Sequence, residues 1–309
     1  MERKISVSDL RKAVDAAYEA VKSEKDGEID PRNFGAKAGE FGISVVLPDG
    51  TTINKGDTQV KSPMGKIAKI PLFSLLLEQN GVDNLVKKSG TCPCHKVPEK
   101  PQGLKFDPHF MRAFSAVEPT GDADSKWNLY INRVIDMMGS APEMNDKLFE
   151  YLQKEAQESK LVDTLAADGY YLYDDASIAA DLVEKAMSMT AATEQLARMG
   201  ATVLADGVNP ETKAEVFDGR YSQNIIGMMA AKGPHKMNLP WLVKAGIPAK
   251  RSFGGAMLGI LPGTLSIAAY APELNPAGVS VKAAKAIMHV MRELDLSAFA
   301  SARVKFVND

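Results

Sequence analysis

The chain has 309 residues, a formal net charge of −2, and apolar and charged fractions of 45% and 25%, which are ordinary for a globular protein. This length suits one large or two ordinary domains. The weak net charge, without any run rich in lysine and arginine, excludes nucleic acid as an expected partner. No apolar run is long enough to span a membrane, and the first residues lack the apolar core of a signal peptide. We therefore expect a cytoplasmic protein with no membrane partner.

The N-terminal part of the chain predicts a helix followed by a β-hairpin. Ser6-Val7-Ser8-Asp9 fits a capping box, and apolar residues then recur at helical spacing as far as Val21. Residues 42–47 and 51–55 predict two strands, joined by the turn Pro48-Asp49-Gly50.

Two lysines mark the segment that follows this hairpin, where a strand leads into a helix. Lys66 and Lys69 are three residues apart, so a helical turn would bring their Cβ atoms to about 5–6 Å from each other. Their mutual repulsion and the positive end of the helix dipole both disfavour a second charge, so we expect one amine to be neutral near pH 7. The alternative is a surface turn with two solvated lysines, because lysine is almost never fully buried.

Residues 80–107 contain several glycines and prolines and predict a long irregular connection. Cys92-Pro93-Cys94-His95 lies inside it and could hold a soft metal ion. A closed zinc site needs a fourth ligand, however, and the other histidines have no ligand spacing. We expect ordinary thiols there, no metal site, and no cofactor in this protein.

Helical patterns dominate residues 127–232. Two further strands, 254–261 and 264–270, and a helix at 280–294 close the chain.

Strands at both ends of the chain with helices between them predict an α/β (α+β) architecture. We expect one antiparallel sheet built from both termini, flanked by helices, with an inserted all-helical lobe. The mixed α/β lobe would comprise residues 1–75 and 236–309, and the helical lobe residues 76–235. A cleft between the two lobes is the default place for a site.

Four stretches of the sequence resemble the serine-dependent glutaminases, which share the β-lactamase/penicillin-binding-protein fold. They are Leu47-Pro48-Asp49-Gly50 with Gly56-Asp57, Met64 to Ile70, Val117 to Asp122, and Gly246 to Lys250 with Gly254-Gly255 and Tyr270 to Gly278. The resemblance implies that fold, hydrolysis of L-glutamine to L-glutamate and ammonia, a small amino-acid-like molecule as partner, and a homo-oligomer.

The same resemblance locates the expected site residues. In the family a serine nucleophile stands three residues before a lysine that acts as base. An ungapped match from Gly56-Asp57 places the base at Lys69 and the nucleophile position at Lys66, so the serine is replaced. The resemblance assigns substrate binding to Asn132, His235, Lys250, Ser252 and Phe253.

Three functions remain open at this point. The chain could be an amidohydrolase of altered or lost activity, with Ser62 or Ser252 as substitute nucleophile, although neither has the family's spacing. It could be a Schiff-base enzyme, a lyase or decarboxylase, in which Lys66 attacks a small carboxylate-bearing carbonyl substrate and Lys69 either lowers the pKa of Lys66 or acts as base. It could also be a non-catalytic relative that binds a small molecule.

Overall fold

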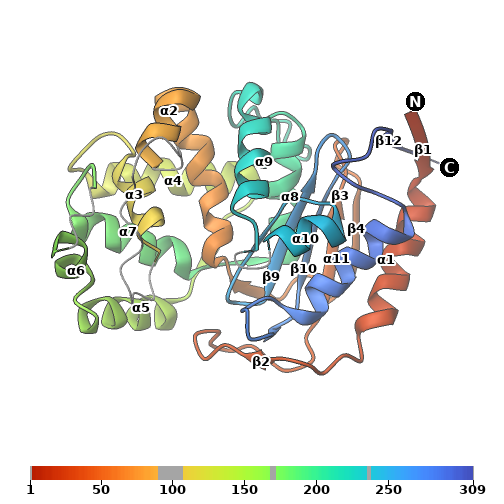
Figure 1. Ribbon diagram of the computed structural model, residues 1–309, viewed down its shortest axis with the longest axis horizontal. Coiled ribbons are helices and arrows are strands. Elements are labelled where there is room, and N and C mark those ends of the chain that lie inside the picture. The colour runs from red at the N-terminus through yellow and green to blue at the C-terminus, as the bar shows by residue number, and fades with distance from the viewer. Residues whose placement is uncertain (1, 90–106, 168–171, 235–237, 309) are drawn as a thin grey trace.

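The computed structural model describes residues 2–89, 107–167, 172–234 and 238–308. The chain forms two lobes side by side (Figure 1). One, the helical lobe, is made of helices, and the other, the sheet lobe, is a sheet covered by helices. Among the described residues, no helix combines the length and apolar character that crossing a membrane requires.

The sheet lobe contains a five-stranded antiparallel sheet in the order β4-β3-β10-β9-β8. Its strands are β3 (Gly42–Val46), β4 (Thr52–Gly56), β8 (Ala249–Arg251), β9 (Ala256–Leu261) and β10 (Leu265–Tyr270). Strands from the beginning and the end of the chain meet at the pairing of β3 with β10, where Ile267 lies opposite Val45. The predicted sheet built from both termini is therefore confirmed.

Helices cover both faces of this sheet, which explains why every residue of β3, β9 and β10 is buried. On one face lie α1 (Val7–Val21), α10 (Asn238–Ala245) and α11 (Val281–Glu293), and on the other lies α8 (Thr193–Leu204). The predicted cap of α1 is present, because the Ser6 hydroxyl accepts a hydrogen bond from the Asp9 amide. Gly200 allows α8 to approach the sheet closely, since a Cβ there would lie 2.3 Å from Ser266 Oγ.

The helical lobe packs around an apolar core in which the Phe110, Phe114 and Tyr130 rings are in contact. Its helices are α2 (Lys69–Ser89), α3 (Pro108–Ser115), α4 (Ala123–Met138), α5 (Asp146–Glu158), α6 (Leu161–Ala167) and α7 (Ala176–Ser188). The helix α9 (Ser222–Ala231) contacts α2 and α8.

The predicted irregular connection 80–107 is wrong in its first part, because α2 continues to Ser89. Gly81 takes a left-handed φ of 69° at a kink, and Leu85 beyond it is buried in the core. Gly81 therefore interrupts the helix, as its sequence signal predicts, and the chain resumes a helical course beyond it. The Cys92-Pro93-Cys94-His95 segment lies outside the described residues.

Several short strands were not predicted from the sequence. β1 (Glu2–Ser6) pairs in parallel with β12 (Arg303–Val307), so the two ends of the chain lie together (Figure 1). β2 (Glu28–Ile29) pairs with β11 (Glu273–Leu274), and β7 (Met189–Ala192) pairs with both β5 (Lys61–Pro63) and β6 (Glu143–Met144). The pairing of β5 with β7 joins the helical lobe to the segment that leads into Lys66.

A buried ion pair fixes the loop between α3 and α4. The Lys126 ammonium, fully inaccessible to solvent, lies 2.6 Å from Asp174 Oδ2 and donates to the Ser115 carbonyl. The same Asp174 oxygen accepts from the Gly121 amide at 2.9 Å. Asp174 thus compensates a buried charge and holds the loop's backbone.

We expect the substitution Asp174→Asn to destabilise the protein, because it leaves the Lys126 charge buried and uncompensated. The free energy of unfolding, measured by urea titration, should fall by about 3 kcal/mol. Glu158→Gln, which removes the exposed partner of Lys154, serves as the control and should change it far less. Equal effects of the two substitutions would contradict the role given to Asp174.

Candidate functional site

The two lysines predicted to share a helical face do so in the structure, at the boundary between the lobes. Lys66 lies in the short 3-10 helix η1 (Gly65–Ala68), and Lys69 begins α2. Their ammonium groups reach one oxygen, Asp107 Oδ2, at 3.0 Å and 2.8 Å respectively. Lys66 keeps 39% of its side chain exposed, whereas Lys69 keeps 11%. A ligand can therefore reach Lys66 most easily.

Asp107 uses its two oxygens for different purposes. Its Oδ1 accepts a hydrogen bond from the His109 amide and so caps α3, while its Oδ2 binds both lysines. Burial raises the pKa of Asp107, but Lys69 and Lys66 outweigh that effect and hold it well below its usual range. Asp107 is therefore ionised at neutral pH.

The sequence interpretation missed Asp107 because it assigned this residue to the end of an irregular connection. Aspartate directly before Pro108 is nevertheless typical of a helix N-cap followed by proline at the first helical position. That signal would have located the start of α3. It would not have revealed the two lysines, which lie far earlier in the chain.

Lys250, on β8, joins the same group of charges from the sheet lobe. Its side chain is buried, and its ammonium donates to the Lys232 carbonyl at 2.5 Å. Burial lowers the pKa of Lys250 to about 7, and repulsion from Lys69, Lys66 and Lys232 adds to this against the opposing charge of Asp107. Burial also lowers the pKa of Lys69, against the effect of Asp107. An amine that is partly neutral near pH 7 thus occurs at Lys250.

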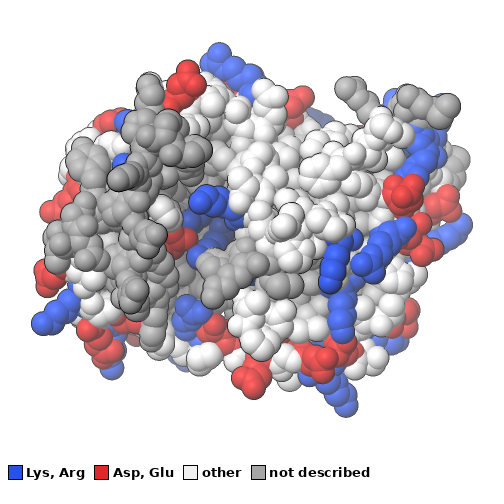
Figure 2. All heavy atoms as spheres, in the orientation of Figure 1, with Lys and Arg blue, Asp and Glu red and all other residues white. Residues whose placement is uncertain are grey.

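We use the term lysine cluster for Lys66, Lys69, Lys250, Asp107 and Lys232, the last included because its charge acts on Lys69 and Lys250. Figure 2 shows lysine and arginine side chains gathered in a hollow in the middle of the molecule, between the helical lobe and the sheet lobe. Within the described part of the chain, Asp107 is the one carboxylate in ion-pair contact with these lysines. The cluster therefore carries an excess of positive charge.

Ser252 and Phe253 lie against the lysine turn, but both are used in packing. The Ser252 hydroxyl donates to the Pro63 carbonyl and accepts from the Gly254 amide at 2.9 Å. The Phe253 ring packs against Gly65, and the Arg32 guanidinium lies 4.4 Å from its centroid. Gly65 has a φ of 49°, and a Cβ there would lie 2.8 Å from Ser252 Oγ. These contacts hold the backbone that carries Lys66.

The structure does not bring Asn132, another predicted binding residue, to the cluster. Asn132 lies on the exposed face of α4, and no hydrogen bond or ion pair links it to the described members of the cluster. His235 lies outside the described residues. Ser62 is buried in β5, opposite Ala191. The Tyr130 hydroxyl donates to the Ala68 carbonyl at 2.9 Å, and burial raises its pKa well above the ordinary value.

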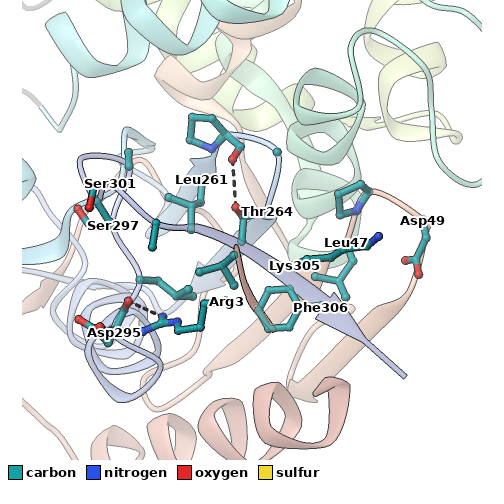
Figure 3. A pocket seen from close by; sticks show the side chains of 18 residues that line it. Arg3, Leu47, Asp49, Leu261, Thr264, Asp295, Ser297, Ser301, Lys305 and Phe306 are labelled. Carbon is teal, nitrogen blue, oxygen red and sulfur yellow. Dashed lines mark hydrogen bonds and ion pairs between the residues drawn. The ribbon is translucent and has the colours of Figure 1, made fainter. Parts of the chain in front are cut away.

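A separate cavity of about 1110 Å³ lies at the opposite end of the sheet (Figure 3). Arg3 and Asp295 line it and are paired with each other at 2.7 Å. Leu261, at the end of β9, faces this cavity, whereas Ala256, at the start of β9, adjoins the turn that contains Ser252. We place the candidate site at the lysine cluster and not in this cavity. Several titratable groups with shifted pKa values converge at the cluster.

The arrangement of the cluster suits recognition of an anion more than coordination of a metal. No group of three His, Cys, Asp or Glu side chains in the described ranges is placed to hold a metal ion. Ammonium groups are donors only, and charge-assisted hydrogen bonds to carboxylate or phosphate are among the strongest they form.

Comparisons with known proteins agree on one family. The family model for glutaminase matches residues 34–299. The glutaminase of Bacteroides thetaiotaomicron is 33% identical over 97% of both chains, and that of Parabacteroides distasonis is 32% identical over the full length of both. Among solved structures, the probable glutaminase YbaS has a TM-score of 0.84 at 24% identity, covering 96% of this chain and all of that one. A covalent complex of the Bacillus subtilis glutaminase YbgJ with 5-oxo-L-norleucine has a TM-score of 0.78 at 20% identity, covering 94% and 98%.

The lowered pKa of Lys250 predicts how stability depends on pH. The unfolded chain, with a lysine pKa of about 10.4, binds more protons than the folded chain above pH 7, so the contribution of Lys250 to the free energy of unfolding rises with pH by up to about 1.4 kcal/mol per unit. In urea titrations at pH 7, 8 and 9, wild type should gain stability relative to Lys250→Met. The control Lys12→Met, on the exposed face of α1, should follow wild type in parallel. A constant difference between wild type and Lys250→Met would show that Lys250 keeps its ordinary pKa.

Proposed function

Because this chain belongs to the glutaminase family, we propose that its cleft binds a small carboxylate-bearing molecule of amino-acid size but has lost the serine-ester route to glutamine hydrolysis. The observation that carries the proposal is the contact of Lys66 and Lys69 with one oxygen of Asp107. At the position that the family resemblance assigns to the serine, the side chain is an amine in an ion pair. Attack of that amine on an amide would yield another stable amide, not a readily hydrolysed ester.

The described hydroxyl groups near the lysine turn do not replace the missing serine. A serine-type amidase needs a hydroxyl beside a base that can take its proton. The Ser252 hydroxyl is used in two hydrogen bonds, and Ser62 is buried in a paired strand. Lys69, the expected base, is held in an ion pair 2.8 Å from Asp107 Oδ2, although burial lowers its pKa against the effect of that carboxylate. The nucleophile of the expected mechanism is therefore absent, whatever the protonation of the base.

What the cleft retains is the capacity to hold an anion. The relative YbgJ was captured with 5-oxo-L-norleucine, an amino-acid-like molecule, bound covalently. On this chain we expect a ligand of similar size near Lys66, with its carboxylate bound by the ammonium groups of the cluster. The β-lactamase-like fold is kept, and the chemistry of its cleft is changed.

We expect wild-type protein to release no ammonia from L-glutamine above the rate of Lys66→Ala, because neither has a hydroxyl nucleophile at position 66. Ammonia release should be measured by a coupled assay, with the Bacteroides thetaiotaomicron glutaminase as positive control. Ammonia release by wild type that survives Lys66→Ala would identify another nucleophile and overturn the proposal. Release that disappears in Lys66→Ala would assign catalysis to the amine.

The lowered pKa of Lys250 favours one second function, Schiff-base chemistry. An amine with a pKa of about 7 is half unprotonated at neutral pH and can attack a carbonyl carbon, with loss of water, to form an imine. The expectation from sequence placed this amine at Lys66. The electrostatics of the cluster favour Lys250 instead, although it is only 4% exposed.

Treating the protein with borohydride in the presence of pyruvate tests this second function. An imine on Lys250 would be reduced to a stable secondary amine, seen by mass spectrometry as an added group on the peptide that contains it. Lys250→Met should abolish the adduct, whereas Lys12→Met should not. Absence of any adduct on wild type would remove this function and leave the binding proposal in place.

A further inference from the structure

We infer that the ligand of this cleft is a compact dianion without a free ammonium group, held by Lys66, Lys69, Lys232 and Lys250, and that Asp107 is its intramolecular competitor. Two negative charges on one small molecule are the shared chemistry, which a dicarboxylate or a phosphate group supplies. The inference rests on the proposed function for the place of the site and adds the charge of the ligand.

The first argument is the balance of charge in the cluster. Asp107 pairs with two ammonium groups, those of Lys66 and Lys69, and the charges of these lysines and of Lys232 act on Lys250 nearby. Among the described residues, four lysines and one carboxylate leave an excess of three positive charges when all the lysines are protonated. Lys232 is exposed, and no described acidic side chain pairs with it. A monoanion would offset a third of that excess, whereas a dianion offsets most of it.

The second argument concerns hydrogen-bond donors. The Lys250 ammonium has three donors, and one of them meets the Lys232 carbonyl. No other hydrogen bond joins this side chain to a residue that the structure describes, although it is 96% inaccessible. A buried donor without an acceptor is costly. An oxyanion entering the hollow would supply the missing acceptors.

The third argument excludes a zwitterionic amino acid such as glutamine as the preferred ligand. Its α-ammonium group needs a carboxylate partner. Asp107 already binds two lysines with one oxygen and caps α3 with the other. An additional cation in the hollow would therefore meet mainly like charge.

Asp107 itself indicates where an anion lies. Its Oδ2 occupies the point between Lys66 and Lys69 at which a ligand oxygen would be bound by both. Its negative charge also repels an incoming anion and uses donors that the ligand needs. Asp107→Asn removes this charge but keeps an oxygen that can cap α3, since asparagine is as good an N-cap as aspartate.

Calorimetric titration of the full chain tests the inference with four probes: inorganic phosphate, glutarate, acetate and L-glutamine. We expect phosphate or glutarate to bind at least about tenfold more tightly than acetate and L-glutamine, and to weaken as salt is added. Tighter binding of phosphate than of glutarate would identify the ligand as a phosphate compound, and the reverse would identify it as a dicarboxylate. Tighter binding of L-glutamine than of both dianions, or binding of none of the four, would overturn the inference.

Variants distinguish a specific site from general charge attraction. Asp107→Asn should tighten dianion binding by about tenfold, and Lys232→Met and Lys250→Met should weaken it by a similar factor. Lys232 is exposed, so its substitution does not threaten the fold, and Lys12→Met on α1 is the matched control that should change nothing. Equal affinity of Lys232→Met, Lys250→Met and the control for the dianion would contradict the inference.

The ammonia assay separates the two proposals. If wild type shows no preference for dianions and releases no ammonia from glutamine, this inference alone is overturned, and the proposal that the chain has lost glutamine hydrolysis stands. Ammonia release from glutamine by wild type would overturn the proposed function itself.

Discussion

One carboxylate, that of Asp107, holds together charges that would otherwise repel each other. Lys66 and Lys69 come from the turn that enters α2, Asp107 begins α3, and Lys250 belongs to the edge strand β8. The contacts of Asp107 thus join the turn that enters α2 to the start of α3, and Lys250 lies near enough from the sheet lobe to feel the same charge. Without that charge, burial and mutual repulsion would disfavour the protonated lysines together. Until an anion binds between the lysines, the geometry of the cleft depends on this shared ion pair.

The fold can accommodate a changed site, because the fold depends on buried side chains and the chemistry of the cleft depends on partly exposed ones. The sheet is buried on both faces, and Ile67, Ala68 and Ile70, which flank the two lysines, are buried in the core. Lys66 is a half-exposed side chain on a short 3-10 helix, whose backbone is held by Gly65 and by the Ser252–Pro63 hydrogen bond. A different side chain at position 66 would change the chemistry of the cleft and leave the packing of the core unchanged. The family therefore identifies the fold of this chain, and the cleft must be argued from its own residues.

Patterns within short segments of the sequence predicted the helices and strands that depend on those segments. The hairpin of β3 and β4, the strands β9 and β10 and the helix α11 followed from hydrophobic periodicity, and the side-by-side placement of Lys66 and Lys69 followed from helical spacing. The partner of these lysines could not be predicted in that way, because Asp107 lies 38 residues beyond Lys69. The pairing of β1 with β12 joins the two ends of the chain and leaves no local signal either. Such contacts are set by tertiary packing and not by the periodicity of a segment.

The protonation state of Lys250 decides between two kinds of chemistry in the cleft, binding of a dianion and formation of an imine. A dianion bound beside it would favour the ammonium form and raise its pKa above 7, so that the amine would no longer be nucleophilic. A neutral carbonyl group would leave the pKa low and the amine reactive. Strong binding of a dianion and imine formation at Lys250 therefore oppose each other. Asp107 pairs with Lys66 and Lys69 and forms no ion pair with Lys250, so the charge of the incoming ligand decides which state the Lys250 amine adopts.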